Sequence, residues 1–125
     1  MPISPAARQE LRRLVVLAAG EFDRVGDTVA AENLRALRNV DDASLDGGQV
    51  NVEAWEQLQR QAWRTADHGN WAAAQAAVWA RLDGLANPID WAAIIGDPDP
   101  RARRLAKALM RLVCLRATRH VTDGG

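Results

Sequence analysis

Apolar residues recur at helical spacing along most of the chain, and polar capping residues separate the stretches. Ser4 and Pro5 come first and supply a side-chain acceptor for a helix cap and a ring that fixes the first helical φ. An apolar stripe follows, made up of Leu11, Leu14, Val15, Ala18, Phe22 and Val25. Because this spacing places the side chains on one helix face, it predicts a helix that ends at Gly26.

The same pattern predicts five further helices. Their expected ranges, with the capping residues, are 27–39, 51–69, 70–86, 88–95 and 97–121. Residues 41–49 show no periodicity and contain three aspartates and two glycines, so we expect a polar loop there. No segment alternates with the period of two that marks a strand. The chain is therefore predicted to form a single all-α domain over residues 1–125, a compact bundle of five to six helices with a basic C-terminal helix.

Charge is distributed unevenly along this neutral chain, which has 16 basic and 16 acidic residues. The stretch from Arg101 to Val121 contains seven basic residues and no acidic one. The rest of the chain, with nine basic and 16 acidic residues, carries a formal charge of −7. Such asymmetry indicates a polyanionic partner, because a basic segment attracts phosphates and other anions.

The basic segment separates charge from apolar surface around the predicted helix. At about 100° per residue, Arg103, Arg104, Lys107 and Arg111 fall within about a third of the circumference. The opposite side carries the stripe Ala102, Leu105, Leu109, Leu112 and Val113. We therefore predict that these four cations and Arg101 bind nucleic acid. Since no Asn or Gln accompanies them, they are expected to contact the backbone without reading sequence, and the choice between RNA and DNA stays open.

An alternative is that the basic helix is neutralised within the protein. Residues 39–59 contain no basic residue and carry the carboxylates of Asp41, Asp42, Asp46, Glu53 and Glu56. Pairing with them would explain the charge balance without any function. Exposed pairs of this kind contribute only about 0–1 kcal/mol each to stability.

Tryptophan is frequent, and four of the five tryptophans recur every eight residues, at Trp55, Trp63, Trp71 and Trp79. Eight residues rotate a helix by about 80°, so these rings cannot share one stripe. We expect Trp55 and Trp71 in the core, with Trp63 and Trp79 on the shoulders of their helices. On the shoulders, Trp63 and Trp79 would be exposed enough to stack on bases or to anchor a partner protein.

The residue inventory argues against an enzyme. The chain has two histidines, no tyrosine and two serines, and no nucleophile and base stand at a spacing that supports catalysis. The carboxylate-then-histidine spacing of metal sites in bundles is absent, and no glycine pattern fits a phosphate loop. We therefore expect no catalytic residue, no metal, no cofactor and no small-molecule substrate.

Cysteine use and apolar run lengths bear on location. Cys114 is the single cysteine and cannot form an internal disulfide, which favours a reducing, cytoplasmic location. Arg111 could acidify its thiol, but a structural or incidental cysteine is the favoured interpretation. No apolar run approaches the roughly 18 to 20 residues of a membrane span. A basic pair followed by apolar residues 14–19 imitates a signal sequence, but Glu10 and Glu21 flank it, so we expect an amphipathic helix.

Residues 52–88 resemble one tetratricopeptide-type hairpin. The matching positions are Trp55 and Leu58 in the first helix, Gly69, Asn70 and Trp71 at the turn, Ala74 and Val78 in the second helix, and Pro88 at the end. The resemblance implies that the two helices of this segment pack antiparallel as an αα-hairpin.

The whole chain also resembles the small helical subunits of multi-subunit CRISPR effector complexes. Its size, all-helical pattern, lack of catalytic residues and basic face carry the resemblance. The resemblance implies a protein that joins other subunits along a backbone of guide-binding proteins and offers Arg and Lys to nucleic acid. We therefore expect a non-catalytic subunit of a nucleoprotein assembly, and as the alternative a protein-interaction adaptor that uses the Trp-rich segment 52–88.

Overall fold

Seven α-helices and one 3₁₀ turn make up the part of the chain that the computed structural model describes, residues 2–37, 40–48 and 50–119, and no strand occurs there. The helices are α1 (Pro5–Arg24), α2 (Thr28–Arg35), α3 (Asp42–Gly47), α4 (Val52–Thr65), α5 (Trp71–Asp83), α6 (Trp91–Ile95) and α7 (Pro100–Ala117), and the 3₁₀ turn is η1 (His68–Asn70). The prediction of an all-α bundle is confirmed, but the described residues form seven α-helices rather than five to six. Among the described helices, none combines the length and apolar character needed to cross a membrane.

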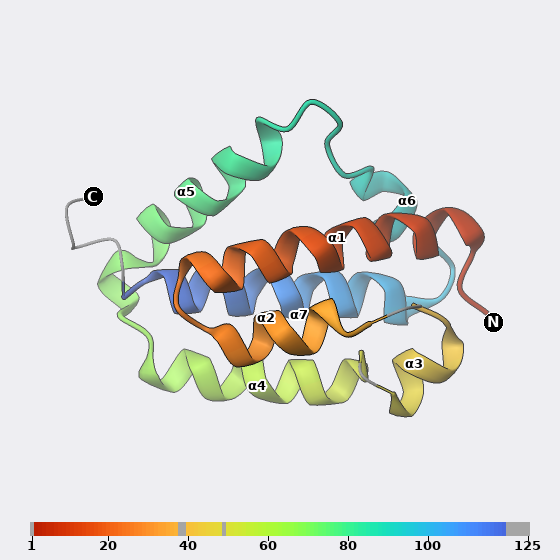
Figure 1. The fold of residues 1–125 in the computed structure, drawn as a ribbon, viewed down its shortest axis with the longest axis horizontal. Coiled ribbons are helices and arrows are strands. Elements are labelled where there is room, and N and C mark those ends of the chain that lie inside the picture. The colour runs from red at the N-terminus through yellow and green to blue at the C-terminus, as the bar shows by residue number, and fades with distance from the viewer. Residues whose placement is uncertain (1, 38–39, 49, 120–125) are drawn as a thin grey trace.

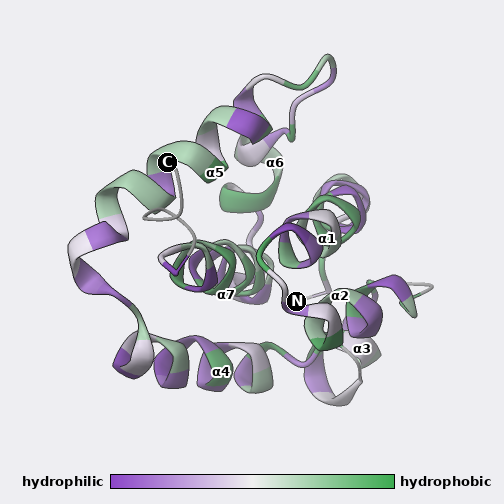
Figure 2. Ribbon diagram, turned by 60° about the vertical axis from the view of Figure 1, so that its left-hand side comes forward, coloured by the Kyte–Doolittle hydropathy of each residue, from purple (hydrophilic) through white to green (hydrophobic). Residues whose placement is uncertain are grey.

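The basic helix α7 is the central element of the fold. It packs against α1, α4, α5 and α6, which surround it in Figure 2, whereas α2 packs mainly on α1 (Figure 1). Eleven of its 18 residues are buried. They include the whole predicted stripe and, in addition, Ala106, Ala108, Met110, Cys114, Leu115 and Ala117. A helix covered from four directions buries far more than one stripe, so only a narrow strip of α7 reaches solvent.

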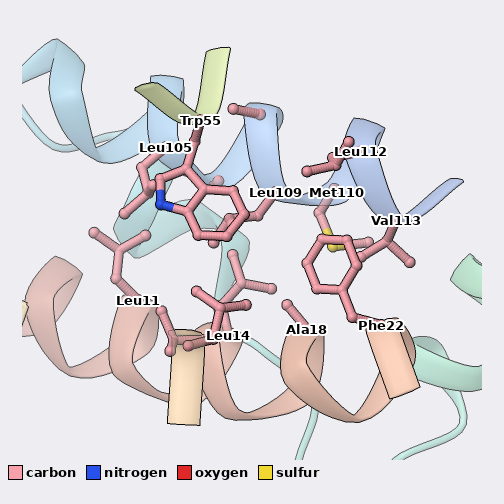
Figure 3. Packing of buried hydrophobic residues seen from close by; sticks show 14 of the residues in the cluster. Leu11, Leu14, Ala18, Phe22, Trp55, Leu105, Leu109, Met110, Leu112 and Val113 are labelled. Atoms are coloured by element: carbon pink, nitrogen blue, oxygen red, sulfur yellow. The ribbon is translucent and has the colours of Figure 1, made fainter. Parts of the chain in front are cut away.

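Two aromatic rings from different helices meet in the core beside α7. Phe22 of α1 and Trp55 of α4 have ring centroids 6.2 Å apart and planes inclined at 29°. Leu14 and Leu109 belong to the same buried cluster (Figure 3). The expected core position of Trp55 is confirmed, since only 4% of this residue is exposed.

Capping residues fix most helix starts where the sequence predicts them. The Ser4 side chain accepts a hydrogen bond from the Ala7 amide, and the Asn51 side chain accepts one from the Ala54 amide. Several other boundaries differ from the prediction. α2 ends at Arg35 rather than at residue 39, which lies outside the described residues, and α6 begins at Trp91 rather than at residue 88. α4 ends at Thr65 and α5 at Asp83, each a few residues before the predicted end.

The predicted loop at residues 41–49 contains a helix, α3, so this prediction is wrong. The Asp41 side chain accepts a hydrogen bond from the Ser44 amide at 2.9 Å and caps the helix. Leu45 is buried and ties α3 to the core. A helix of six residues is too short to show periodicity, which is why the sequence pattern does not reveal it.

The predicted hairpin of residues 52–88 does not form. α4 and α5 diverge from η1 (Figure 1), and each packs on α7 rather than on the other. The reason lies in the turn, where Thr118 accepts hydrogen bonds from the Asp67 amide and the Asn70 side chain. Because the turn is bound to the C-terminal end of α7, α7 occupies the space between the two helices.

Replacing Trp55 with Ala is expected to lower the free energy of unfolding by about 3–5 kcal/mol, because the change removes a large buried ring and leaves a cavity. Trp63→Ala is the matched control and should cost less than about 1 kcal/mol, since Trp63 is 44% exposed. Urea denaturation followed by circular dichroism measures both. Equal losses for the two variants would contradict the assignment of the core.

Candidate nucleic-acid interface

Three of the five predicted nucleic-acid-binding residues form a line on the exposed strip of α7. Arg103, Lys107 and Arg111 are all exposed and stand four residues apart. Each step of four residues corresponds to a rise of about 6 Å. None of them forms an ion pair with a carboxylate of residues 2–37, 40–48 or 50–119. Their positive charge is therefore available to an external anion.

Arg101 is engaged within the protein. Its Nε lies 3.0 Å from Oδ2 of Asp99, its Nη1 lies 2.6 Å from Oδ1 of Asp46, and its Nη2 also pairs with Asp42. These hydrogen bonds raise the pKa of the guanidinium and hold the pKa of the Asp99 carboxyl below its ordinary value. Arg101 donates to Asp99 at the start of α7 and to two aspartates of α3, so it links these two segments.

Arg104 is paired as well. Its Nη2 lies 2.5 Å from Oε1 of Glu56 on α4, and its Nε lies 3.1 Å from Oε2. The hydrogen bond from Arg104 lowers the pKa of the Glu56 carboxyl. Internal neutralisation, the alternative drawn from the sequence, thus accounts for Arg101 and Arg104. The side chains of Arg104 and Glu56 both reach solvent, so their ion pair contributes at most about 1 kcal/mol to the stability of the fold.

A groove of about 510 Å³ runs beside the exposed cations, between α7 and the pair α5 and α6. Its lining comprises Trp71, Gln75, Trp79, Trp91, Ile95, Arg103, Arg104, Ala106, Lys107, Met110, Arg111 and Cys114. The side chains on α5 and α6 are mostly aromatic or aliphatic, and those on the rim of α7 are basic. None of the described side chains that line the groove is acidic. This arrangement suits a ligand that has both anionic and flat apolar parts.

Two buried carboxylates of α1 hold the far wall of the groove in place. Glu21 accepts hydrogen bonds from Arg81 of α5, with Nη2 at 2.5 Å and Nε at 2.9 Å from Oε1. Glu10 accepts a hydrogen bond from the Asp90 amide at 2.6 Å, which lowers the pKa of the Glu10 carboxyl and fixes the start of α6. Arg13 donates to the carbonyls at residues 87–88 of the same loop. The groove is therefore preformed.

The tryptophans expected to bind a partner lie in different surroundings. Trp79 is half-buried in the groove wall, where its ring centroid is 5.1 Å from that of Trp91. Trp63 is more exposed, stacks on His68 at 4.3 Å and meets the edge of Trp71 at 5.8 Å. Trp71, which was expected in the core, is only partly buried and lines the groove. Trp63 and Trp79 therefore do not form a single contact surface.

Sequence reasoning missed Trp91 and Ile95. The helix that carries them has five residues, and only one of its two adjacent isoleucines faces the core. Ile94 is fully buried, whereas Ile95 is 61% exposed at the groove. The adjacency of two isoleucines on a one-turn helix is the only sequence signal that one of them lies on the surface.

Cys114 lies at the floor of the groove but is almost completely buried. Burial, assisted by Glu21, raises the pKa of its thiol to about 11. This agrees with a structural cysteine rather than with acidification by Arg111, because loss of hydration outweighs the nearby positive charge, which is that of Arg81. The thiol is protonated at neutral pH and adds to the apolar floor. In the described residues no group of His, Cys, Asp and Glu side chains is arranged to hold a metal ion.

Comparison of the chain with protein-family models, curated proteins and solved structures gives no match. The resemblance of the whole chain drawn from the sequence therefore stays a prediction, and the case for a function is carried by the geometry of the strip and groove.

Replacing Arg101 with Gln is expected to destabilise the protein by roughly 2–4 kcal/mol at neutral pH, because it leaves the carboxylate of buried Asp99 without its cation. Arg104→Gln, which breaks an exposed pair, is the control and should cost less than about 1 kcal/mol. Urea denaturation measures both. If Arg101→Gln lowers the free energy of unfolding no more than the control does, Arg101 does not stabilise the protein by linking α3 to α7.

The pH dependence provides a second readout. Since the pKa of Asp99 is depressed in the folded state, its stabilising contribution is present above the unfolded value of 3.8 and disappears as pH falls through the lower folded value. The difference in stability between the wild type and Arg101→Gln should therefore shrink below about pH 4.

Proposed function

We propose that this protein is a non-catalytic helical subunit of a nucleoprotein assembly and contacts a nucleic-acid backbone without sequence preference through Arg103, Lys107 and Arg111. The observation that carries the proposal is the line of three exposed cations without an ion-pair partner among the described residues. Each phosphate contact by such a cation adds affinity through the release of counterions.

The position of these cations on α7 supports the same function. The backbone of α7 is held by its neighbours on every other side, so the attachment points of the three side chains stay fixed relative to one another. Their repeat of about 6 Å offers evenly spaced charge to a polyanion. Base-reading amides are absent from the strip, which favours backbone contact over recognition of base edges.

A protein-interaction adaptor is the second candidate, and the apolar side of the groove favours it. Ile95 is exposed there beside Trp79 and Trp91. Aromatic residues, Met and Arg are enriched where proteins bind one another. In this case the anchors would be Trp79 and its neighbours in the groove rather than Trp63.

Changing Arg103, Lys107 and Arg111 together to Gln is expected to weaken binding to nucleic acid and to reduce the slope of log K against log salt by about 2–3 units, because three phosphate contacts are lost. Fluorescence anisotropy with labelled DNA over a series of salt concentrations measures the slope. Circular dichroism first establishes that the variant retains its helices.

The matched control replaces Arg8, Arg12 and Arg64 with Gln. These arginines are also exposed and form no ion pair in the described part of the chain, so this variant loses the same charge from other surfaces. If both variants reduce the slope equally, binding depends on net charge alone. An unchanged slope in the first variant would overturn the backbone contact and leave the adaptor as the better candidate.

A further inference from the structure

We infer that the groove between α5, α6 and α7 accepts unpaired bases, so that the nucleic acid bound along α7 is single-stranded. This inference rests on the proposed function and specifies its substrate. The cations of α7 would hold the phosphates while the bases enter the groove and pack against its aromatic wall.

The two walls of the groove provide the two kinds of contact that a single strand needs. The α7 side offers Arg103, Lys107 and Arg111, which span about 12 Å of helix. The opposite side offers Trp71 and Trp79, which are eight residues apart and also span about 12 Å, with Trp91 next to Trp79. A stacked strand advances 3.4 Å per nucleotide, so this length holds roughly three or four nucleotides. Basic grooves lined by aromatic rings bind single strands because every base has a face that can stack.

The charges on either side of the strip direct the strand into this groove. On the α4 side of α7, a second hollow is lined by two carboxylates and two arginines, Glu53, Glu56, Arg60 and Arg104, so its charges cancel. Arg104, which lines both hollows, is paired with Glu56. On the α5 and α6 side, none of the described lining residues is acidic, and Cys114 is kept uncharged by its raised pKa. Of the two hollows that flank the strip of α7, the one beside the tryptophans therefore attracts a polyanion more strongly.

A duplex matches the groove less well. Its bases are paired and stacked inside, so a duplex can neutralise the cations but cannot place rings against Trp79, Trp91 and Ile95. Filling the apolar part of the groove requires bases that are free to leave a stack. The single polar side chain on the α5 wall, Gln75, can donate to or accept from any base, which agrees with binding that tolerates all sequences.

The test compares three DNA ligands: two single strands that carry the same phosphates but differ in having bases, and a duplex whose bases are paired and which carries twice the phosphates. They are oligothymidylate of about 12 nucleotides, an abasic oligomer of the same length, and a duplex of that length. Fluorescence anisotropy at one salt concentration should show at least a tenfold tighter complex for oligothymidylate than for the abasic oligomer, because stacking adds to the phosphate contacts. Oligothymidylate should also quench tryptophan fluorescence, and the abasic oligomer should leave it unchanged.

Variants of the wall locate the effect. Trp91→Leu keeps apolar bulk but removes the ring, and it should reduce the preference for oligothymidylate over the abasic oligomer without changing the affinity for the latter. Trp63→Leu is the control, since Trp63 lies outside the groove lining and meets it at the edge of Trp71, and it should lose less of the preference than Trp91→Leu. If Trp91→Leu fails to fold, the inference is still tested by whether oligothymidylate, and not the abasic oligomer, quenches the tryptophan fluorescence of the wild-type protein.

The outcomes separate this inference from the function on which it rests. Equal, salt-dependent binding of all three ligands would overturn the base-accepting groove and leave backbone binding intact. Equal binding of oligothymidylate and duplex, both tighter than the abasic oligomer, would also overturn it, because stacking would not distinguish free from paired bases. Failure of every ligand to bind would overturn the proposed function itself, and the protein-partner candidate would replace it.

Discussion

The burial of α7 among four other helices determines both the stability and the surface chemistry of this protein. Eleven of its 18 residues lie in the core, which leaves one narrow strip and the two helix ends for polar side chains. The basic residues of this helix are therefore concentrated on that strip or paired near its ends. Arg101 and Arg116 are examples of the second kind, since each reaches a carboxylate of another segment. Burial of the other faces of α7 thus explains why Arg103, Lys107 and Arg111 lie in one line.

Carboxylates on α1 shape the rest of the groove. Glu10 and Glu21 are each only 8% exposed, and a buried carboxylate is costly unless it is paired. Glu21 pairs with Arg81 of α5, and Glu10, whose charge is neutralised by Arg13 of the same helix, accepts a hydrogen bond from the Asp90 amide in the loop before α6, so these contacts also set the distance of the tryptophan wall from α7. The contacts that the buried carboxylates of α1 require therefore also determine the width of the groove.

The sequence allowed long elements to be predicted better than contacts between them. α1, α4 and α7 have stripes of several turns and clear caps, so their existence and buried faces could be read from periodicity, as could the exposure of Arg103, Lys107 and Arg111. α3 is too short for a pattern. The pairing of Arg101 with Asp42 and Asp46 joins residues 59 and 55 positions apart, which spacing along one helix cannot reveal. The divergence of α4 and α5 likewise depends on Thr118, far along the chain from the turn that it holds.

The central place of α7 also bears on how the chain folds during synthesis. α7 follows all the other described helices in the chain, yet α4 and α5 bury their apolar faces mainly against it. Until α7 has left the ribosome, those faces have no surface on which to pack, and exposed apolar surface of this kind favours aggregation. We expect the native core to form only after α7 has emerged, so the helix that offers cations to a ligand is also the one whose arrival completes the fold.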